Sequence, residues 1–282
     1  MAFRRRGYER DALLQAVVER SGYLELIREE EEQQGGQKRL LAALPHELSH
    51  FDLEQYRDRP VQGEVAELLV TPKTDRGFTS CVLLHGMGGT GKTMTAVAVL
   101  QDTSVRAFFS DIYWLTVGAD AVGEKITQLQ GTFHRQLTGK VASSDEEKSA
   151  QEWQQALVAA MAGKTRALVV LDDPWTPEQT RLLNPIDGSS AEHRLLVTSR
   201  IRDLLPKATR VELPLMGKDE AVALLLDLAS IDEKSYFAEQ PDSAWPPDAA
   251  YEIAAECGLL PITLIIAAQV MRSWGSGWGT YV

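Results

Sequence analysis

An α/β fold, in which helices cover both faces of a parallel β-sheet, is predicted for the middle of this chain by two features. After residue 77, short apolar runs alternate with longer segments of helical periodicity, which is the pattern of such a sheet. From about residue 217 onward the periodicity is helical, with no further strand. We therefore expect a helical N-terminal segment over residues 1–58, a three-layer α/β/α domain over 59–216 and a small helical domain over 217–282.

The strand candidates are short apolar runs, whereas the helix candidates repeat their apolar residues every three or four positions. Strands are expected at Cys81–His85, Ile112–Val117, Ala167–Leu171, Leu195–Thr198 and Arg210–Leu213. Helices are expected at 11–27, 94–100, 146–162, 219–229 and from Pro247 onward. For helix 146–162, Ser144 with Glu147 is a predicted capping box and Gly163 a predicted end.

The composition narrows the possible functions. A hydrophobic content of 44% over 282 residues is sufficient for a real core, and the net charge of −11 argues against binding to nucleic acid or anionic lipid. The longest apolar run, Leu259–Ala268, is about half of the roughly 20 residues that a membrane span needs, so we interpret it as a core helix. Cys81 and Cys257 lie in apolar stretches and are predicted to be buried thiols in a reducing compartment. Because the N-terminus lacks an apolar signal sequence, a cytoplasmic location is expected.

A glycine-rich loop follows the first predicted strand. Residues 86–93 match the pattern G-x-x-x-x-G-K-[ST], with a strand before and a helix after them. Glycines let the backbone N–H groups face inward, and a helix N-terminus attracts anions. The pattern predicts a P-loop for a purine nucleotide, in which Lys92 reaches the β- and γ-phosphates and Thr93 ligates Mg²⁺. The residues expected to contact the nucleotide here are Gly86, Met87, Gly88, Gly89, Thr90, Gly91, Lys92, Thr93 and Met94.

Two acidic residues follow the apolar run of the third predicted strand. Asp172 is expected to hold Mg²⁺, directly or through water, because the carboxyl ends of parallel strands meet at one edge of a sheet. Asp173 is placed to orient or deprotonate a water that attacks the γ-phosphate. The alternative, in which both acids cap the helix after Trp175, stays open.

An arginine follows the fourth predicted strand. Arg200 is expected at the same sheet edge, where a guanidinium pairs with a phosphate and senses whether the γ-phosphate is present. The alternative is a surface arginine without such a role.

Four ordered segments, GMGGTGKT, LVVLDDPW, LLVTSR and CGLLPITL, resemble the NB-ARC domain of plant disease-resistance proteins and animal apoptosis-activating factors. The resemblance covers about residues 60–275. It implies a signal-transducing P-loop ATPase whose α/β domain is followed by a small helical domain, a winged helix and usually sensor repeats. Since neither of the last two parts precedes Val282, we expect a truncated helical domain, or a partner that supplies them.

The resemblance also assigns residues by position. Lys92 and Thr93 match the family's phosphate and Mg²⁺ residues, and Asp172 with Asp173 matches its acidic pair. Arg200 matches the arginine that contacts the terminal phosphate.

Two further matches concern the base of the nucleotide. Pro261 matches the proline that lies against the base from the helical domain. Residues 60–64, with Val61 as the expected contact, resemble the segment whose backbone brackets adenine, although the usual arginine is missing there.

A zinc site is a competing interpretation. His46-Glu47-Leu48-Ser49-His50 fits H-E-x-x-H, which on a helix would place two imidazoles around zinc with Glu47 as general base. No third ligand stands out, and Pro45 would put the motif at the very start of its helix. A solvent-facing turn explains these residues more simply.

These features predict a switch that binds ATP or ADP with Mg²⁺, hydrolyses ATP slowly and acts in signalling of the innate-immunity or cell-death type. Protein partners or self-association are expected, and neither nucleic acid nor a membrane span is. A nucleotide-loaded scaffold without turnover is compatible with the same residues. A metabolic small-molecule kinase is disfavoured because nothing downstream resembles an acceptor-binding lid.

Overall fold

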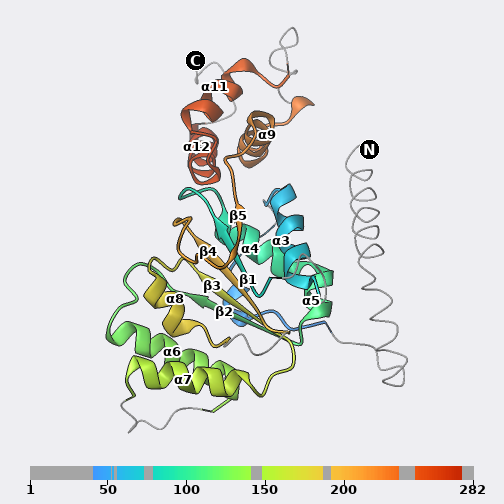
Figure 1. Ribbon diagram of the computed structural model, residues 1–282. Coiled ribbons are helices and arrows are strands. Elements are labelled where there is room, and N and C mark those ends of the chain that lie inside the picture. Colours follow the sequence, from blue (N-terminus) through green and yellow to red (C-terminus); the bar gives the residue numbers. More distant parts are fainter. Residues whose placement is uncertain are drawn as a thin grey trace, which may run out of the picture.

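The computed structural model describes residues 41–51, 53, 56–72, 79–140, 148–186, 192–234 and 245–274. Within this part an α/β domain is joined through residues 213–217 to a helical domain that lies beyond one edge of the sheet (Figure 1). The predicted helix 11–27 and the predicted capping residue Ser144 lie outside the described residues.

The sheet has five parallel strands in the order β2-β3-β4-β1-β5. The strands are β1 (Cys81–His85), β2 (Asp111–Thr116), β3 (Ala167–Asp172), β4 (Arg194–Ser199) and β5 (Thr209–Glu212). All five lie where apolar runs predicted them, with ends that differ by a residue or two. The predicted parallel α/β class is therefore confirmed.

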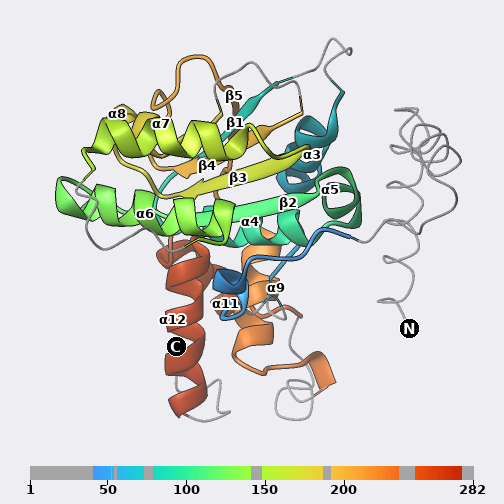
Figure 2. The ribbon, with the colours of Figure 1, turned by 90° about the horizontal axis from the view of Figure 1, so that it is seen from below.

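Helices cover both faces of the sheet. On one face lie α3 (Pro60–Val70), α4 (Lys92–Gln101) and α5 (Thr103–Phe108), and on the other α6 (Glu124–Thr138), α7 (Ala150–Met161) and α8 (Pro177–Leu183). Successive strand residues point to opposite faces. Val82 and Leu84 accordingly belong to the core beneath α3–α5, whereas Leu83 belongs to the core beneath α6–α8. Figure 2 shows α6 and α7 side by side.

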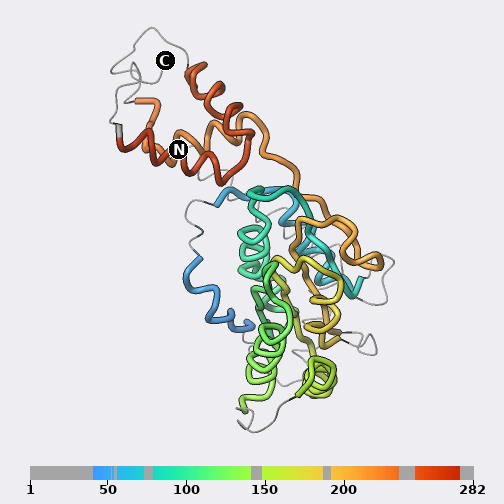
Figure 3. The backbone as a smooth tube through the Cα atoms, turned by 90° about the vertical axis from the view of Figure 1, so that its left-hand side faces the viewer, coloured from blue at the N-terminus to red at the C-terminus, as the bar shows by residue number. Residues whose placement is uncertain are grey.

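The helical domain has its own core. Its helices α9 (Lys218–Leu228), α11 (Asp248–Glu256) and α12 (Pro261–Trp274) enclose Leu225, Ala250 and Leu264. Figure 3 shows this domain as a separate body above the α/β domain. The interpretation of 259–268 as a core helix is wrong for one face, because the side chains of Ile262 and Ile266 are 53% and 57% exposed.

Helix α7 begins later than the sequence indicated. It starts at Ala150 rather than 146, with Ser149 as the N-cap. The Ser149 hydroxyl accepts the Glu152 backbone N–H, and the Glu152 carboxylate accepts the Ser149 N–H, which together make a capping box. The Ser-x-x-Glu spacing occurs three times in this stretch, at 143/146, 144/147 and 149/152, and the N-cap of α7 belongs to the last of these.

Two other sequence expectations concern the cysteines and the membrane. Cys81 and Cys257 are free thiols that are half-buried rather than fully buried, and burial raises the pKa of the Cys81 thiol to about 12. Within the described ranges, no helix has both the length and the apolar character that crossing a bilayer requires.

Loss of the Ser149 cap tests the corrected helix start. Ser149→Ala should lower the free energy of unfolding by about 1 kcal/mol, because the first turn of α7 loses its side-chain acceptor. Urea unfolding followed by circular dichroism measures this change. The control Gln151→Ala, an exposed substitution in the same turn, should stay within about 0.5 kcal/mol of the parent. Equal stabilities of the two variants would contradict the assignment.

Candidate nucleotide-binding site

The loop between β1 and α4 is closely packed and needs its glycines. A Cβ on Gly86 would lie 2.6 Å from the carbonyl oxygen of Leu213, so a larger residue would displace backbone. Gly89 and Gly91 have φ values of 84° and 95°, a region that side chains other than hydrogen rarely tolerate. The loop therefore has the strand-turn-helix form that the sequence predicted, and it ends where α4 begins.

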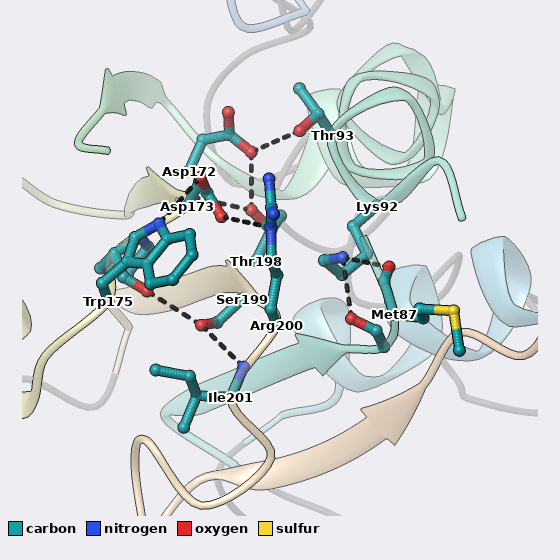
Figure 4. Close-up of polar contacts among 12 residues, drawn as sticks. Met87, Lys92, Thr93, Asp172, Asp173, Trp175, Thr198, Ser199, Arg200 and Ile201 are labelled. Carbon is teal, nitrogen blue, oxygen red and sulfur yellow. Dashed lines mark hydrogen bonds and ion pairs between the residues drawn. The ribbon is translucent and has the colours of Figure 1, made fainter. Parts of the chain in front are cut away.

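Lys92 lies at the first position of α4 and its side chain is buried. Its Nζ atom donates hydrogen bonds to the carbonyl oxygens of Gly86 and Met87, at 2.9 and 2.8 Å (Figure 4). Burial lowers the pKa of Lys92, and the charge of Arg200 lowers it further. The ammonium group is thus held within the curve of the loop, where a phosphate group would offer it a charge-assisted partner.

Thr93, Asp172 and Thr198 form a hydrogen-bonded group next to the loop. The hydroxyl groups of Thr93 and Thr198 both donate to Asp172 Oδ1, at 2.8 and 2.6 Å. Asp172 is only 4% exposed, and burial raises the pKa of its carboxyl group. The second residue of α4 and the last residue of β3 therefore meet, as their positions predicted.

This group suits Mg²⁺ better than it suits a metal that is bound entirely by protein side chains. A hydroxyl and a carboxylate are the oxygen ligands that Mg²⁺ accepts from proteins beside phosphate oxygens and waters. Across the described segments, no cluster of three or more His, Cys, Asp or Glu side chains is placed to hold a metal. Thr93 and Asp172 are thus suited to hold a metal that a nucleotide brings with it.

Asp173 and Arg200 lie together beside the loop. The Nε atom of Arg200 is 3.8 Å from Asp173 Oδ1, and a Cβ on Gly88 would lie 3.3 Å from an Arg200 terminal nitrogen. Trp175 contacts both, since its Nε1 donates to Asp173 Oδ2 at 3.1 Å and its ring lies 5.1 Å from the guanidinium carbon. Figure 4 shows the Arg200 side chain between Trp175 and Lys92.

The capping alternative for the two acids is wrong. Helix α8 is capped by Thr176, whose side chain accepts the Gln179 backbone N–H, while the Gln179 side chain accepts the Thr176 N–H. Neither Asp172 nor Asp173 caps this helix. The Asp172 carboxylate is bonded by Thr93 and Thr198, and the Asp173 carboxylate lies against Trp175 and Arg200.

The helical domain reaches the loop through the start of α12. A Cβ on Gly89 would lie 2.6 Å from a methyl carbon of Ile262, and a Cβ on Gly91 would lie 4.0 Å from the Pro261 ring. Pro261 thus lies near the P-loop, and its contact with the base of a nucleotide stays a prediction. Ile262 packs closer still, although no role was predicted for it from the sequence.

Arg59 is a site residue that sequence reasoning missed. Its buried guanidinium donates to the carbonyl oxygens of Thr90, Pro214 and Leu215, at 3.4, 2.8 and 3.0 Å, and its Nε lies 3.5 Å from Glu220 Oε1. It thus joins the loop to the connection between the domains and to α9. The sequence contains a signal for this residue, because the resembling segment of the family carries an arginine and Arg59 directly precedes residues 60–64.

The other residues predicted to contact the nucleotide lie on the loop or on the helices beside it. Val61 is half-buried on α3, and Met94 is half-buried on α4, directly after Thr93. Met87 has an exposed side chain, and its carbonyl oxygen also accepts the Thr90 hydroxyl at 2.9 Å. Thr198 and Trp175, which sequence reasoning did not assign, provide hydrogen bonds that orient the two acids.

The H-E-x-x-H motif does not form the helix that a zinc site needs. Residues His46–Leu48 make a single 3-10 turn, and both His46 and His50 are exposed. Glu47 accepts a hydrogen bond from the Gln136 side chain at 2.6 Å. The simpler interpretation, a solvent-facing turn, agrees with this geometry.

The fold and the site together define a P-loop nucleotide-binding domain. The family model for the NB-ARC domain matches residues 60–234, which is more than half of the chain, and the chain belongs to the NB-ARC family.

Relatives of three kinds share this region. The regulatory protein AfsR of Streptomyces coelicolor is 34% identical over 68% of this chain and 18% of that protein. Apoptotic protease-activating factor 1 of Danio rerio is 25% identical over 79% of this chain and 17% of that protein. Disease resistance protein ADR1 of Arabidopsis thaliana is 29% identical over 67% of this chain and 20% of that protein. The chain therefore spans about a fifth of the length of these relatives.

The buried carboxyl group of Asp172, one of the two side chains suited to hold Mg²⁺, gives a prediction about stability. Because burial raises the pKa of Asp172, stability is lost as the pH rises from the ordinary pKa of an aspartate to the raised value, and the loss persists at neutral pH. Asp172→Asn keeps an acceptor for both threonine hydroxyls and removes the charge. Without Mg²⁺ and nucleotide, this variant should have a higher free energy of unfolding at pH 7, and its stability should fall less as the pH rises from the ordinary pKa of an aspartate to neutrality.

Urea unfolding across that pH range measures both effects. The control Asp203→Asn, at an exposed carboxylate that pairs with Arg210, should change stability at pH 7 by less than about 0.5 kcal/mol. An Asp172→Asn variant that is less stable than the parent at pH 7 contradicts the account of Asp172 as a costly buried charge.

Proposed function

We propose that this chain is a nucleotide-dependent switch that binds ATP or ADP with Mg²⁺, hydrolyses ATP slowly and couples the bound nucleotide to the arrangement of its two domains. The observation that carries this proposal is the meeting of both domains on the phosphate loop. Ile262 of α12 packs directly on Gly89, and Arg59 links Thr90 to the interdomain connection. In this proposal, a change of the nucleotide bound in the phosphate loop changes the contacts that position the helical domain.

In this proposal the loop binds the phosphates. The backbone N–H groups of residues 88–93 and the N-terminus of α4 face the phosphate oxygens, and Lys92 exchanges its two carbonyl partners for the β- and γ-phosphates. Thr93 and Asp172 hold Mg²⁺, which when bound neutralises developing negative charge on the phosphates.

Asp173 and Arg200 act on the terminal phosphate. Asp173 orients the attacking water or accepts its proton, since its side chain lies beside the proposed metal seat at the end of β3. Arg200 lies close enough to Gly88 to reach a terminal phosphate and to pair with it. Hydrolysis then removes the group that Arg200 binds, which changes the charges around the loop.

A signalling role is supported by what the relatives are called: a regulatory protein, an apoptotic protease-activating factor and a disease resistance protein. We extend this to signalling of the innate-immunity or cell-death type, in the cytoplasm, with protein partners or self-association. The exposed apolar face of α12, with Ile265, Ile266 and Val270, supports a further contact.

Lys92→Ala tests binding. The affinities for both ADP and ATP should fall roughly 10- to 150-fold, the range expected when a charged hydrogen-bond donor is lost. Fluorescence polarisation with labelled ADP, and competition by ATP, measures this. Lys125→Ala is the control, since Lys125 pairs with Asp120 on the exposed surface and should leave both affinities unchanged. Parent-like binding by Lys92→Ala would falsify the assignment of this loop.

Asp173→Asn distinguishes a switch that turns over from a nucleotide-loaded scaffold. Single-turnover hydrolysis of ATP should be slower than in the parent by roughly 10²–10⁴, as for loss of a general base, while ATP still binds. Glu178→Gln, an exposed carboxylate on α8, is the control. Equal rates in the parent and in Asp173→Asn favour the scaffold.

A further inference from the structure

Trp175 has contacts that packing alone does not explain. It is 37% exposed, yet its indole Nε1 donates to Asp173 Oδ2 at 3.1 Å and its ring lies 5.1 Å from the Arg200 guanidinium carbon. Arg200 also faces Asp173 Oδ1 at 3.8 Å. One exposed ring therefore contacts the two side chains to which we assign the chemistry of the terminal phosphate (Figure 4).

The backbone around this ring is firmly held. The Trp175 backbone N–H donates to the buried side chain of Gln179 at 2.7 Å, and the Ser199 hydroxyl donates to the Pro174 carbonyl oxygen at 2.9 Å. Asp173 itself has a φ of 57°, and its N–H donates to both oxygens of Thr198. Hydrogen bonds from the ends of β3 and β4 and from the start of α8 thus fix the backbone that carries the ring.

Arg200 has two competing sets of partners. In the structure it occupies what we call the parked position, between the Trp175 ring and Asp173 Oδ1. Its terminal nitrogen also lies next to Gly88, so a phosphate bound in the loop attracts the same guanidinium. Movement to the phosphate would break the contact with the ring and leave Asp173 held by the indole N–H.

We propose that Trp175 is a positioning residue that sets how strongly this site prefers a triphosphate to a diphosphate, by stabilising Arg200 in the parked position. This inference rests on the proposed function and adds a specificity element to it. The aromatic face stabilises the parked guanidinium, whereas the indole N–H orients the Asp173 carboxylate. Removing the aromatic face lowers the free energy needed to move Arg200 to the γ-phosphate. Removing only the indole N–H leaves that free energy unchanged and slows hydrolysis, because Asp173 is less well oriented.

Two substitutions separate these effects. Trp175→Leu removes both the aromatic face and the N–H, whereas Trp175→Phe keeps an aromatic face and removes the N–H. The probes are Mg²⁺ with labelled ADP or with a non-hydrolysable imido analogue of ATP. Trp175→Leu should bind the analogue about two- to fivefold more tightly relative to ADP than the parent does, the size expected for an exposed cation–π pair. Trp175→Phe should keep the parent's ratio and hydrolyse ATP more slowly in a single turnover.

A double-mutant cycle provides the control for simple packing. In an Arg200→Ala background, Trp175→Leu should no longer change the ratio of the two affinities, because the residue that it positions is gone. The difference in emission between the parent and Trp175→Phe isolates the fluorescence of Trp175, and it should change with the ATP analogue but not with ADP. Persistence of the Trp175→Leu effect without Arg200, or equal shifts for both nucleotides, overturns the proposal.

The result also separates this inference from the proposed function. If the parent binds both nucleotides and the ratio does not depend on Trp175, only the positioning role fails. If the parent binds neither nucleotide, the proposed function fails and this inference fails with it.

Discussion

Parallel pairing of β1, β4 and β3 brings three strand ends to one edge of the sheet, and the site depends on this constraint. The register places Thr198 of β4 beside Asp172 of β3 and beside Leu84 of β1. A shift of one residue would turn Asp172 to the opposite face and separate it from Thr93. The buried apolar residues that fix the register thus also fix the distance between the phosphate loop and the acidic strand end.

The same edge holds two buried charged groups at a cost to the fold. Burial raises the pKa of Asp172 and lowers that of Lys92, so the environment disfavours the charged form of each. Hydroxyl and carbonyl partners offset part of this cost in the protein itself. A polyphosphate and a divalent cation supply stronger partners of opposite charge, and any ligand that binds only the folded state stabilises it. Binding and stability are thereby coupled through the same side chains.

Much of this was predictable because it is local in sequence. Continuous apolar runs gave the strands, and the spacing of glycines, Lys92 and Thr93 gave the loop. The parallel sheet then implied that Asp172 and Arg200 lie at the same edge. The start of α7 was not predictable, because Ser-x-x-Glu occurs three times within ten residues, at 143–152. The contacts of Arg59 with Pro214, and of Gly89 with Ile262, join residues more than 150 positions apart, and no local pattern encodes them.

These long-range contacts decide how a nucleotide can affect the helical domain. Ile262 packs on Gly89, which is part of the phosphate loop, so α12 contacts the loop backbone directly. Arg59 adds a second connection, because one guanidinium bonds both the Thr90 carbonyl oxygen and the chain that leads into α9. A shift of the loop backbone that moved Thr90 or Gly89 would weaken both contacts at once. Since both contacts reach the helical domain from the same loop, they are the connections through which the proposed switch would act.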